Sequence, residues 1–323
     1  MIVMLGSGSV DYITIIKYAI LVFPVVAFLI TVPFILLQYH KYGSILFMKT
    51  VITYLFVLYL MCAYFLIILP LPSRDSVLKL TTPRIQLIPF KFVFDFIRET
   101  SFNLFSFKTY LVAIKESCFY VPIFNILLTM PFGIYLRYYL KCDLKRTVFF
   151  TFLLSLFFEL TQLSGLYFIY PRGYRLCDVD DLILNTLGGL IGYFVAGILI
   201  KFLPSREEID QESYKKGEQV SFLRRTISFI CDLGMIILIT MVTSIILAIL
   251  SINVSHLEKI IAFIYFTFVV YFKHGQTYGM RITKIKIVSD DDEPVRLFQL
   301  ILRFILFCLY LIALPYIFTT ALY

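Results

Sequence analysis

The sequence has few charged residues: only 15% are Asp, Glu, Lys or Arg, whereas soluble domains carry about 25%. Apolar residues make up 60% of its 323 positions, and the mean hydropathy is +0.89. Several apolar runs exceed the roughly 18 to 20 residues that a helix needs to cross a bilayer. These runs do not alternate polar and apolar positions, as a membrane β-barrel would require. We therefore predict an all-α polytopic membrane protein.

Residues typical of metal and disulfide sites are also scarce. The six cysteines form no CxxC pair, and the three histidines lie far in sequence from the acidic residues described below. No cleavable signal is expected, because the first apolar run has no basic segment before it and no small-residue cleavage pattern after it. We predict no resident metal and no cofactor, with a divalent cation held by oxygen ligands as an open alternative.

Eight transmembrane helices are predicted, five before and three after the one long polar stretch of the chain. The predicted spans are 16–37, 46–70, 118–136, 148–169, 182–203, 227–251, 258–272 and 298–321. The polar stretch begins at Pro204 and marks a domain boundary. We predict membrane domains at 1–203 and 220–323, joined by a cytoplasmic linker at 204–219. The phenylalanine-rich segment 71–117 is expected to form interfacial helices or a re-entrant pair.

Lysine and arginine residues predict the orientation of the spans. They concentrate in three segments, 137–147, 201–225 and 273–297, which should face the cytoplasm. Both termini, the loop 170–181 and the long segment 71–117 are then extracytoplasmic. The net charge of +8 is attributed to anchoring beside anionic lipid, and no nucleic-acid partner is expected.

Polar residues recur near the outer ends of three predicted spans. The set comprises Asn125 on the third span, Ser155, Glu159 and Gln162 on the fourth, and Arg175, Asp178, Asp180, Asp181 and Asn185 before and within the fifth. Spacings of three and four residues place side chains on one helix face. A carboxylate such as Glu159 costs several kcal/mol in a membrane unless it faces a polar cavity or a partner. We expect the set to converge on one outward-open cavity, with Arg175 as the counter-ion.

A structural interpretation of this set is the alternative. The polar residues could lock helices together or cap them, and for Asp180 alone an ordinary first-turn role is favoured. Gly188, Gly189 and Gly192 include a GxxxG spacing, which predicts close helix packing. No strand precedes these glycines, so a phosphate-binding loop is not expected.

Four motifs carry a family resemblance: "LIPF" at 87–90, "NILLTMPFG" at 125–133, "SLFFELTQ" at 155–162 and "RLCDVDDLILNTLGGLIGY" at 175–193. In this order they resemble the VanZ-like family, over about residues 15–203. Its members are bacterial membrane proteins, and the founding member is linked to low-level teicoplanin resistance. The resemblance implies that the ligand-binding residues are Asn125, Glu159, Gln162, Arg175, Asp178, Asp180, Asp181 and Asn185.

The C-terminal part carries a second resemblance. "LRRTISFICD" and the later "HGQTYGMRITKIKIV" resemble the RDD family, over about residues 220–321. Arg225 and Asp232 are seven residues apart and share a helix face, and Arg303 begins the last span. The resemblance implies transport or ion exchange. A buried ion pair among these three residues, which would only fix helix packing, is the alternative.

Three functions follow as hypotheses. In the preferred one, a protein of the bacterial cell membrane binds a membrane lipid, a lipid-linked wall precursor or a lipoglycopeptide antibiotic in the outer cavity and contributes to glycopeptide resistance. In the second, an intramembrane enzyme acts on a lipid-linked substrate with Glu159 or Asp178 as general base. In the third, an ion-coupled transporter uses Glu159 and Asp232 to carry protons, although the sequence has no inverted repeat.

Overall fold

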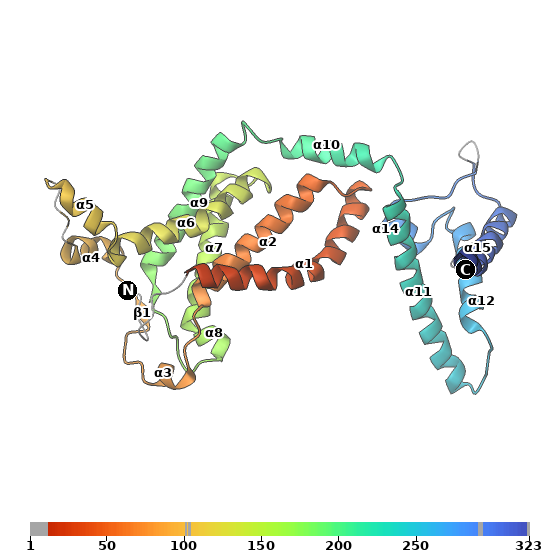
Figure 1. Ribbon diagram of the computed structural model, residues 1–323, viewed down its shortest axis with the longest axis horizontal. Coiled ribbons are helices and arrows are strands. Elements are labelled where there is room, and N and C mark those ends of the chain that lie inside the picture. Colours follow the sequence, from red (N-terminus) through yellow and green to blue (C-terminus); the bar gives the residue numbers. More distant parts are fainter. Residues whose placement is uncertain (1–11, 101, 103–104, 290–292, 322–323) are drawn as a thin grey trace. The chain divides into compact units, whose positions relative to one another are not determined.

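The computed structural model describes residues 12–321, except 101, 103–104 and 290–292 (Figure 1). This part is predominantly helical and contains only two short strands, so the predicted all-α fold is confirmed. In chain order the elements are α1 (Tyr12–Tyr42), α2 (Phe47–Ile68), α3 (Arg74–Leu78), β1 (Ile85–Gln86), α4 (Lys91–Glu99), α5 (Phe107–Ala113), α6 (Ser117–Tyr138), α7 (Leu144–Leu163), α8 (Gly165–Phe168), β2 (Cys177–Asp178), α9 (Val179–Leu199), α10 (Arg206–Gly217), α11 (Phe222–Ile249), α12 (Leu257–Ile264), the π-helix η1 (Tyr265–Val269), α13 (Val270–Phe272), α14 (Tyr278–Ile282) and α15 (Leu297–Ala321). The predicted outward placement of the chain ends concerns residues outside the described part.

Six of the described helices are long and apolar enough to cross a membrane: α1, α2, α6, α7, α9 and α11. They correspond to the first six predicted spans. The seventh, predicted at 258–272, coincides with the run of α12, η1 and α13, in which a π-helical turn interrupts the α-helix. The eighth coincides with α15, which has 25 residues. The chain is therefore a multi-pass membrane protein, and its helices are consistent with eight spans.

The chain divides into two compact units. The first unit is Met1–Leu29 with Met48–Ile209, and the second is Ile30–Phe47 with Asp210–Tyr323. The later division falls within the predicted linker 204–219. The sequence did not indicate that Ile30–Phe47 joins the second unit, where Ser44 Oγ donates a hydrogen bond of 2.5 Å to the carbonyl oxygen of Ser213.

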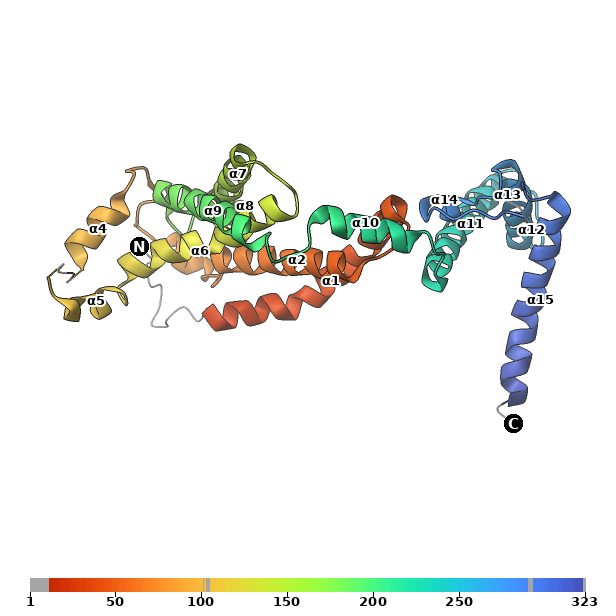
Figure 2. The same ribbon diagram turned by 90° about the horizontal axis from the view of Figure 1, so that it is seen from above.

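Helices α6 and α9 pack closely in the first unit (Figures 1 and 2). A Cβ atom added to Gly192 would lie 2.1 Å from the carbonyl oxygen of Met130, and one added to Gly133 would lie 2.1 Å from that of Gly189. Real side chains do not approach backbone so closely, so only glycine permits this contact. The close packing predicted from the glycine spacing is thus confirmed.

Helix α7 ends earlier than its predicted span, at Leu163 rather than at 169. Gly165 has φ +63°, a conformation that favours glycine, and a Cβ atom there would lie 2.7 Å from the carbonyl oxygen of Arg172. The chain therefore turns through α8 and reaches β2, which pairs in parallel with β1.

The described part of the segment 71–117 contains three short helices, α3, α4 and α5. Helices were predicted there, and their presence is confirmed. Helix α4 exposes apolar side chains, with Phe94 66% and Ile97 72% accessible, as an interfacial helix would. Their position at the membrane interface stays a prediction.

In the second unit, α11 and α12 form a hairpin (Figure 1). The buried residues of α11, namely Arg224, Ser228, Asp232 and Ile236, recur every four positions and so share one face. Helix α14 packs against this helix, and a Cβ atom on Gly279 would lie 2.1 Å from the carbonyl oxygen of Ser228. Close approach at Gly279 positions the polar residues of the second unit.

Candidate functional site

The acidic site of the first unit begins where β1 meets β2. The pairing sets Gln86 opposite Asp178, and Gln86 Nε2 donates a 3.1 Å hydrogen bond to Asp178 Oδ1. The same oxygen accepts from the Asp180 amide at 2.9 Å, so Asp178 is also the N-cap of α9. Sequence reasoning missed Gln86. The one available signal was its position directly before the "LIPF" motif.

Glu159 links α7 to the start of α9. Its side chain is only 3% exposed, and Oε2 accepts a 2.9 Å hydrogen bond from the main-chain amide of Asp178. The structure thus brings together two residues predicted to share a site. The Glu159 carboxylate on α7 therefore lies at the N-terminus of α9, where the helix dipole favours negative charge.

Polar groups from α6, α7 and α9 meet next to Glu159. Asn125 Nδ2 donates to Asp181 Oδ1 at 2.5 Å, and Asn185 Nδ2 donates to Ser155 Oγ at 3.0 Å. Asn185 is 4% exposed, and its Oδ1 atom has no hydrogen-bond partner among the described residues. We call Asn125, Ser155, Glu159, Asp178, Asp181 and Asn185 the acidic cluster; as predicted, three helices contribute to it.

Asp180 points away from this cluster and has a structural role. Its carboxylate accepts from the main-chain amides of Phe90, at 2.6 Å, and Phe92, at 3.0 Å. These amides begin α4, whose own N-cap residue Phe90 makes no side-chain capping bond. Asp180 therefore caps a helix far away in sequence, in keeping with the structural interpretation of this residue.

Arg175 and Gln162 contact the end of α2. Arg175 donates to the carbonyl oxygens of Leu66, at 3.3 Å, and Leu69. Gln162 Nε2 donates to the carbonyl oxygen of Ile67 at 3.4 Å. Both side chains thus hold the free carbonyl groups that any helix leaves at its C-terminus. The sequence predicted Arg175 as the counter-ion of the carboxylates. It did not predict these contacts with main-chain carbonyl groups.

Burial changes the acidity of two residues just before α9. It raises the pKa of the Asp178 carboxyl, while the hydrogen bond from the Asp180 amide acts in the opposite direction. Burial, and after it the charge of Glu159, raises the pKa of the Cys177 thiol to about 12. Cys177 is therefore protonated at neutral pH and is a poor nucleophile.

The acidic cluster is held together by direct contacts. The two cavities described for the structure are lined by other residues. In the described part of the chain, no group of three or more His, Cys, Asp or Glu residues is arranged to hold a metal ion.

The second unit buries Asp232, which is 1% exposed. Oδ1 accepts from Tyr265 Oη at 2.8 Å and from the Gly279 amide at 2.7 Å, and Oδ2 accepts from Thr277 Oγ1 at 2.7 Å. Thr277 and Gly279 belong to "GQTYG" at 275–279, part of the segment that carries the RDD resemblance, so this segment supplies two of the three donors. The carboxylate ties α11 to the start of α14.

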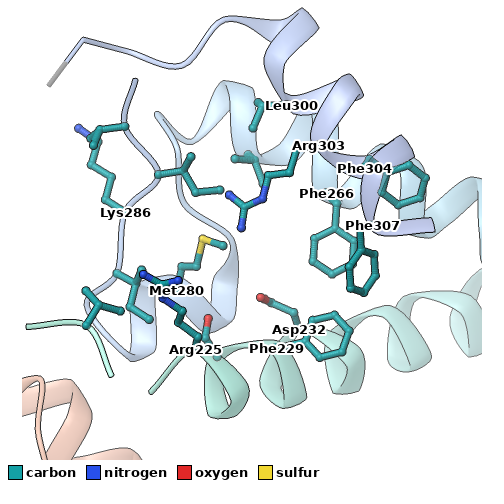
Figure 3. Close-up of a pocket in the computed structure, with 16 residues that line it drawn as sticks. Arg225, Phe229, Asp232, Phe266, Met280, Lys286, Leu300, Arg303, Phe304 and Phe307 are labelled. Carbon is teal, nitrogen blue, oxygen red and sulfur yellow. The ribbon is translucent and has the colours of Figure 1, made fainter. Parts of the chain in front are cut away.

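The predicted alternative of an ion pair among Arg225, Asp232 and Arg303 is wrong. Among the described residues no ion pair joins them, and the Asp232 carboxylate accepts from three uncharged donors. Arg225 and Arg303 instead line a cavity of about 500 Å³ (Figure 3). Sequence reasoning missed Arg224, which is 3% exposed and donates to the carbonyl oxygens of Gly217, Thr283 and Lys284.

Comparison with protein families agrees with both resemblances. A family model described as VanZ/LLP1 matches residues 56–200, and one described as the RDD family matches residues 219–323. The first match begins later than the predicted start at about residue 15, yet it contains the whole acidic cluster. No curated protein and no solved structure matches the chain significantly.

Proposed function

The chain is a tandem of a VanZ/LLP1 segment and an RDD family segment, and on this premise we propose that its acidic cluster binds the polar head group of a cell-envelope molecule. The head group belongs to a membrane lipid, a lipid-linked wall precursor or a lipoglycopeptide antibiotic. Binding occurs at the outer face of a bacterial cell membrane. It lowers the sensitivity of the cell to glycopeptides of the teicoplanin type.

The observation that carries this proposal is the excess of hydrogen-bond acceptors in the acidic cluster. Glu159, Asp178 and Asp181 lie within one set of contacts, and Asn185 Oδ1 is buried without a partner among the described residues. An unsatisfied buried acceptor costs about 1–3 kcal/mol. A ligand that brings N–H or O–H donors, especially an ammonium group, would recover this cost.

A rearrangement has to accompany binding. Asp178 and Asp181 are only partly buried, whereas Glu159 is 3% exposed. The two aspartates would therefore meet the head group first. The Gln86–Asp178 hydrogen bond, 3.1 Å long, is the contact that would open, since it joins the cluster to the outer segment.

The catalytic and transport alternatives have less support. Glu159 as general base would need a substrate proton within reach, and its Oε2 atom already accepts from a main-chain amide. Asp232 as a proton carrier would have to release hydrogen bonds, because its carboxylate already accepts from three uncharged donors. Both alternatives are therefore left as outcomes of the experiments.

The proposal requires that the loop 170–181 is extracytoplasmic and the segment 204–225 is cytoplasmic. Single cysteines placed at 171 and 211 in a cysteine-free variant can be labelled in intact cells with a membrane-impermeant maleimide. We expect the first position to react and the second to react only after lysis. The reverse pattern would contradict an outer binding site.

The main test removes charge from the cluster without removing volume. Glu159→Gln and Asp178→Asn should abolish the teicoplanin tolerance that the wild-type chain confers on a susceptible host. Membrane abundance and melting temperature in detergent should stay near the wild-type values. Loss of tolerance together with lost protein would instead indicate a packing role, and retained tolerance would reject the proposal.

Asp75→Asn is the matched control. Asp75 lies in α3 of the same outer segment, its side chain is exposed, and it belongs to no contact of the acidic cluster. Loss of tolerance in this variant would mean that outer negative charge in general is required. The separate alternatives are tested by product release from a labelled lipid-linked substrate and by proton flux in proteoliposomes.

A further inference from the structure

The cavity in the second unit combines positive charge with aromatic surface. We call it the basic cavity; its volume of about 500 Å³ is within the range of roughly 300–1,000 Å³ typical of ligand sites. Arg225, Lys286 and Arg303 lie on its wall, as does Asp232. These residues come from α11, the segment after α14, and α15. The acidic cluster of the first unit contributes nothing to it.

The charges of the basic cavity are not balanced. Neither Arg225, Lys286 nor Arg303 has a side-chain hydrogen bond or an ion pair with another described residue. Asp232 is the carboxylate on the wall, but its two oxygens already accept three hydrogen bonds from uncharged donors. Cations that share a cavity repel one another, and a bound anion would relieve that repulsion.

The arginines are placed for a membrane anion. Arg225 lies in the first turn of α11, which begins at Phe222, and Arg303 lies in the second turn of α15, which begins at Leu297. A helix rises about 1.5 Å per residue, so both side chains start within roughly 10 Å of their helix ends. The positive-inside pattern assigns these ends to the cytoplasmic side, where anionic lipids attract basic residues.

The other end of the basic cavity is aromatic. Phe229 lies 6.1 Å from Phe266 and 5.6 Å from Phe307, measured between ring centroids, and Phe266 lies 6.5 Å from Phe304. Figure 3 shows these rings on one side and Lys286 and Met280 on the other, with Arg303 between them. A small hydrophilic anion would leave the aromatic half unused.

From this arrangement we infer that the basic cavity binds an anionic phospholipid of the cytoplasmic leaflet. Its phosphate lies between Arg225 and Arg303, whose planar guanidinium groups each offer paired N–H donors to phosphate oxygens. The first part of its acyl chains packs on the phenylalanine rings. Lys286 contacts the outer part of the head group, and Asp232 keeps its structural hydrogen bonds.

The test is a titration of the purified full-length chain in a zwitterionic detergent. Short-chain phosphatidylglycerol is the probe, with short-chain phosphatidylcholine and inorganic phosphate as comparison ligands. We expect phosphatidylglycerol to bind saturably, and each comparison ligand to bind at least tenfold more weakly. Equal binding of phosphatidylcholine would show that the cavity does not select for a net negative charge on the lipid. Equal binding of inorganic phosphate would reject a lipid as the ligand and would indicate a site for a soluble anion.

Substitutions locate the site. Arg225→Gln and Arg303→Gln should each weaken phosphatidylglycerol binding roughly tenfold, the effect of one charge-assisted hydrogen bond. Arg281→Gln should change nothing, because Arg281 is an exposed arginine of α14 outside the cavity lining. Unchanged affinity in both cavity variants would overturn the inference.

Misfolding is controlled by charge-conserving variants. Arg225→Lys and Arg303→Lys keep the positive charge but lose the paired donors of the guanidinium group. Their affinity should fall between those of the wild type and the Gln variants, at an unchanged melting temperature. Lys variants that bind as weakly as the Gln variants while melting normally would contradict a charge-based site. Failure here does not affect the proposal for the acidic cluster, which concerns other residues.

Discussion

Each unit buries a carboxylate within a membrane-spanning helix, but the surroundings of the two differ. Glu159 is 3% exposed and lies beside Asp178 and Asp181, and it accepts from one main-chain amide, 2.9 Å away, and from the Cys177 thiol. Asp232 is 1% exposed and accepts three hydrogen bonds from uncharged groups. Carboxylates inside membranes are commonly functional. Burial is common to both carboxylates; they differ in that uncharged donors surround Asp232, whereas Glu159 lies among further carboxylates.

The difference also predicts opposite ligands. Around Asp232 the acceptors are matched by donors, and the unbalanced groups are the arginines on the cavity wall. Around Glu159 the unbalanced groups are acceptors, including the unpartnered Oδ1 of Asn185. The first unit should therefore bind a ligand rich in donors, and the second an anion.

The largest predicted effect is on stability in the second unit. Asp232→Ala would leave Tyr265, Thr277 and the Gly279 amide without their shared acceptor, and should lower the free energy of unfolding by about 3 kcal/mol or more. Glu159→Ala should cost less, because it removes the acceptor of two donors, the Asp178 amide and the weakly donating Cys177 thiol, rather than three. Thermal unfolding in detergent measures both changes.

Asp232→Asn is the control for this prediction. The amide oxygen still accepts from Tyr265 and Gly279, so the melting temperature should fall less than in Asp232→Ala. If Asp232→Ala melted like the wild type, the carboxylate would not be a structural tie. The distinction from Glu159 would then fail.

A smaller effect is expected from the helix packing that assembles the acidic cluster. Gly192→Ala places a Cβ atom 2.1 Å from the carbonyl oxygen of Met130, so α6 and α9 must separate. Overpacking of this kind costs about 1–3 kcal/mol. It should also weaken the Asn125–Asp181 hydrogen bond that bridges these helices. Melting temperature and teicoplanin tolerance should therefore fall together.

Gly234→Ala is the matched control, because a Cβ atom on Gly234 of α11 meets nothing within 4 Å. This variant should retain the wild-type melting temperature. An equal loss in both variants would mean that helical glycines matter for flexibility. Equal retention would mean that α6 and α9 tolerate a wider separation.

The helices and part of the acidic cluster could be predicted from the sequence, because both depend on local patterns. Apolar runs predict spans, and spacings of three and four residues place Ser155 and Glu159 on one face and Asp178, Asp181 and Asn185 on another. A polar helix face inside a membrane needs a polar partner, so the sequence also predicts that these two faces contact each other.

Contacts between distant segments could not be predicted in this way. The Gln86–Asp178 pairing joins two-residue strands far apart in sequence, and so short a strand has no periodicity to detect. Arg224 and Arg225 are eight and seven residues before Asp232, and both spacings return to nearly the same helix face. Helical periodicity alone therefore does not tell the buried arginine from the one that lines the cavity.

The smallest effect is predicted for Asp180, the acidic residue that stands apart from the cluster. Asp180→Ala removes the acceptor of the Phe90 and Phe92 amides at the start of α4, and loss of such a cap costs about 1 kcal/mol. Hydrogen exchange of these amides should become faster, and the melting temperature should fall slightly. Teicoplanin tolerance should persist, in contrast to Asp178→Asn only two residues away. Since the two aspartates lie two residues apart at the start of α9, loss of tolerance in both variants would show that the order of α4, rather than the charge of the acidic cluster, controls the phenotype.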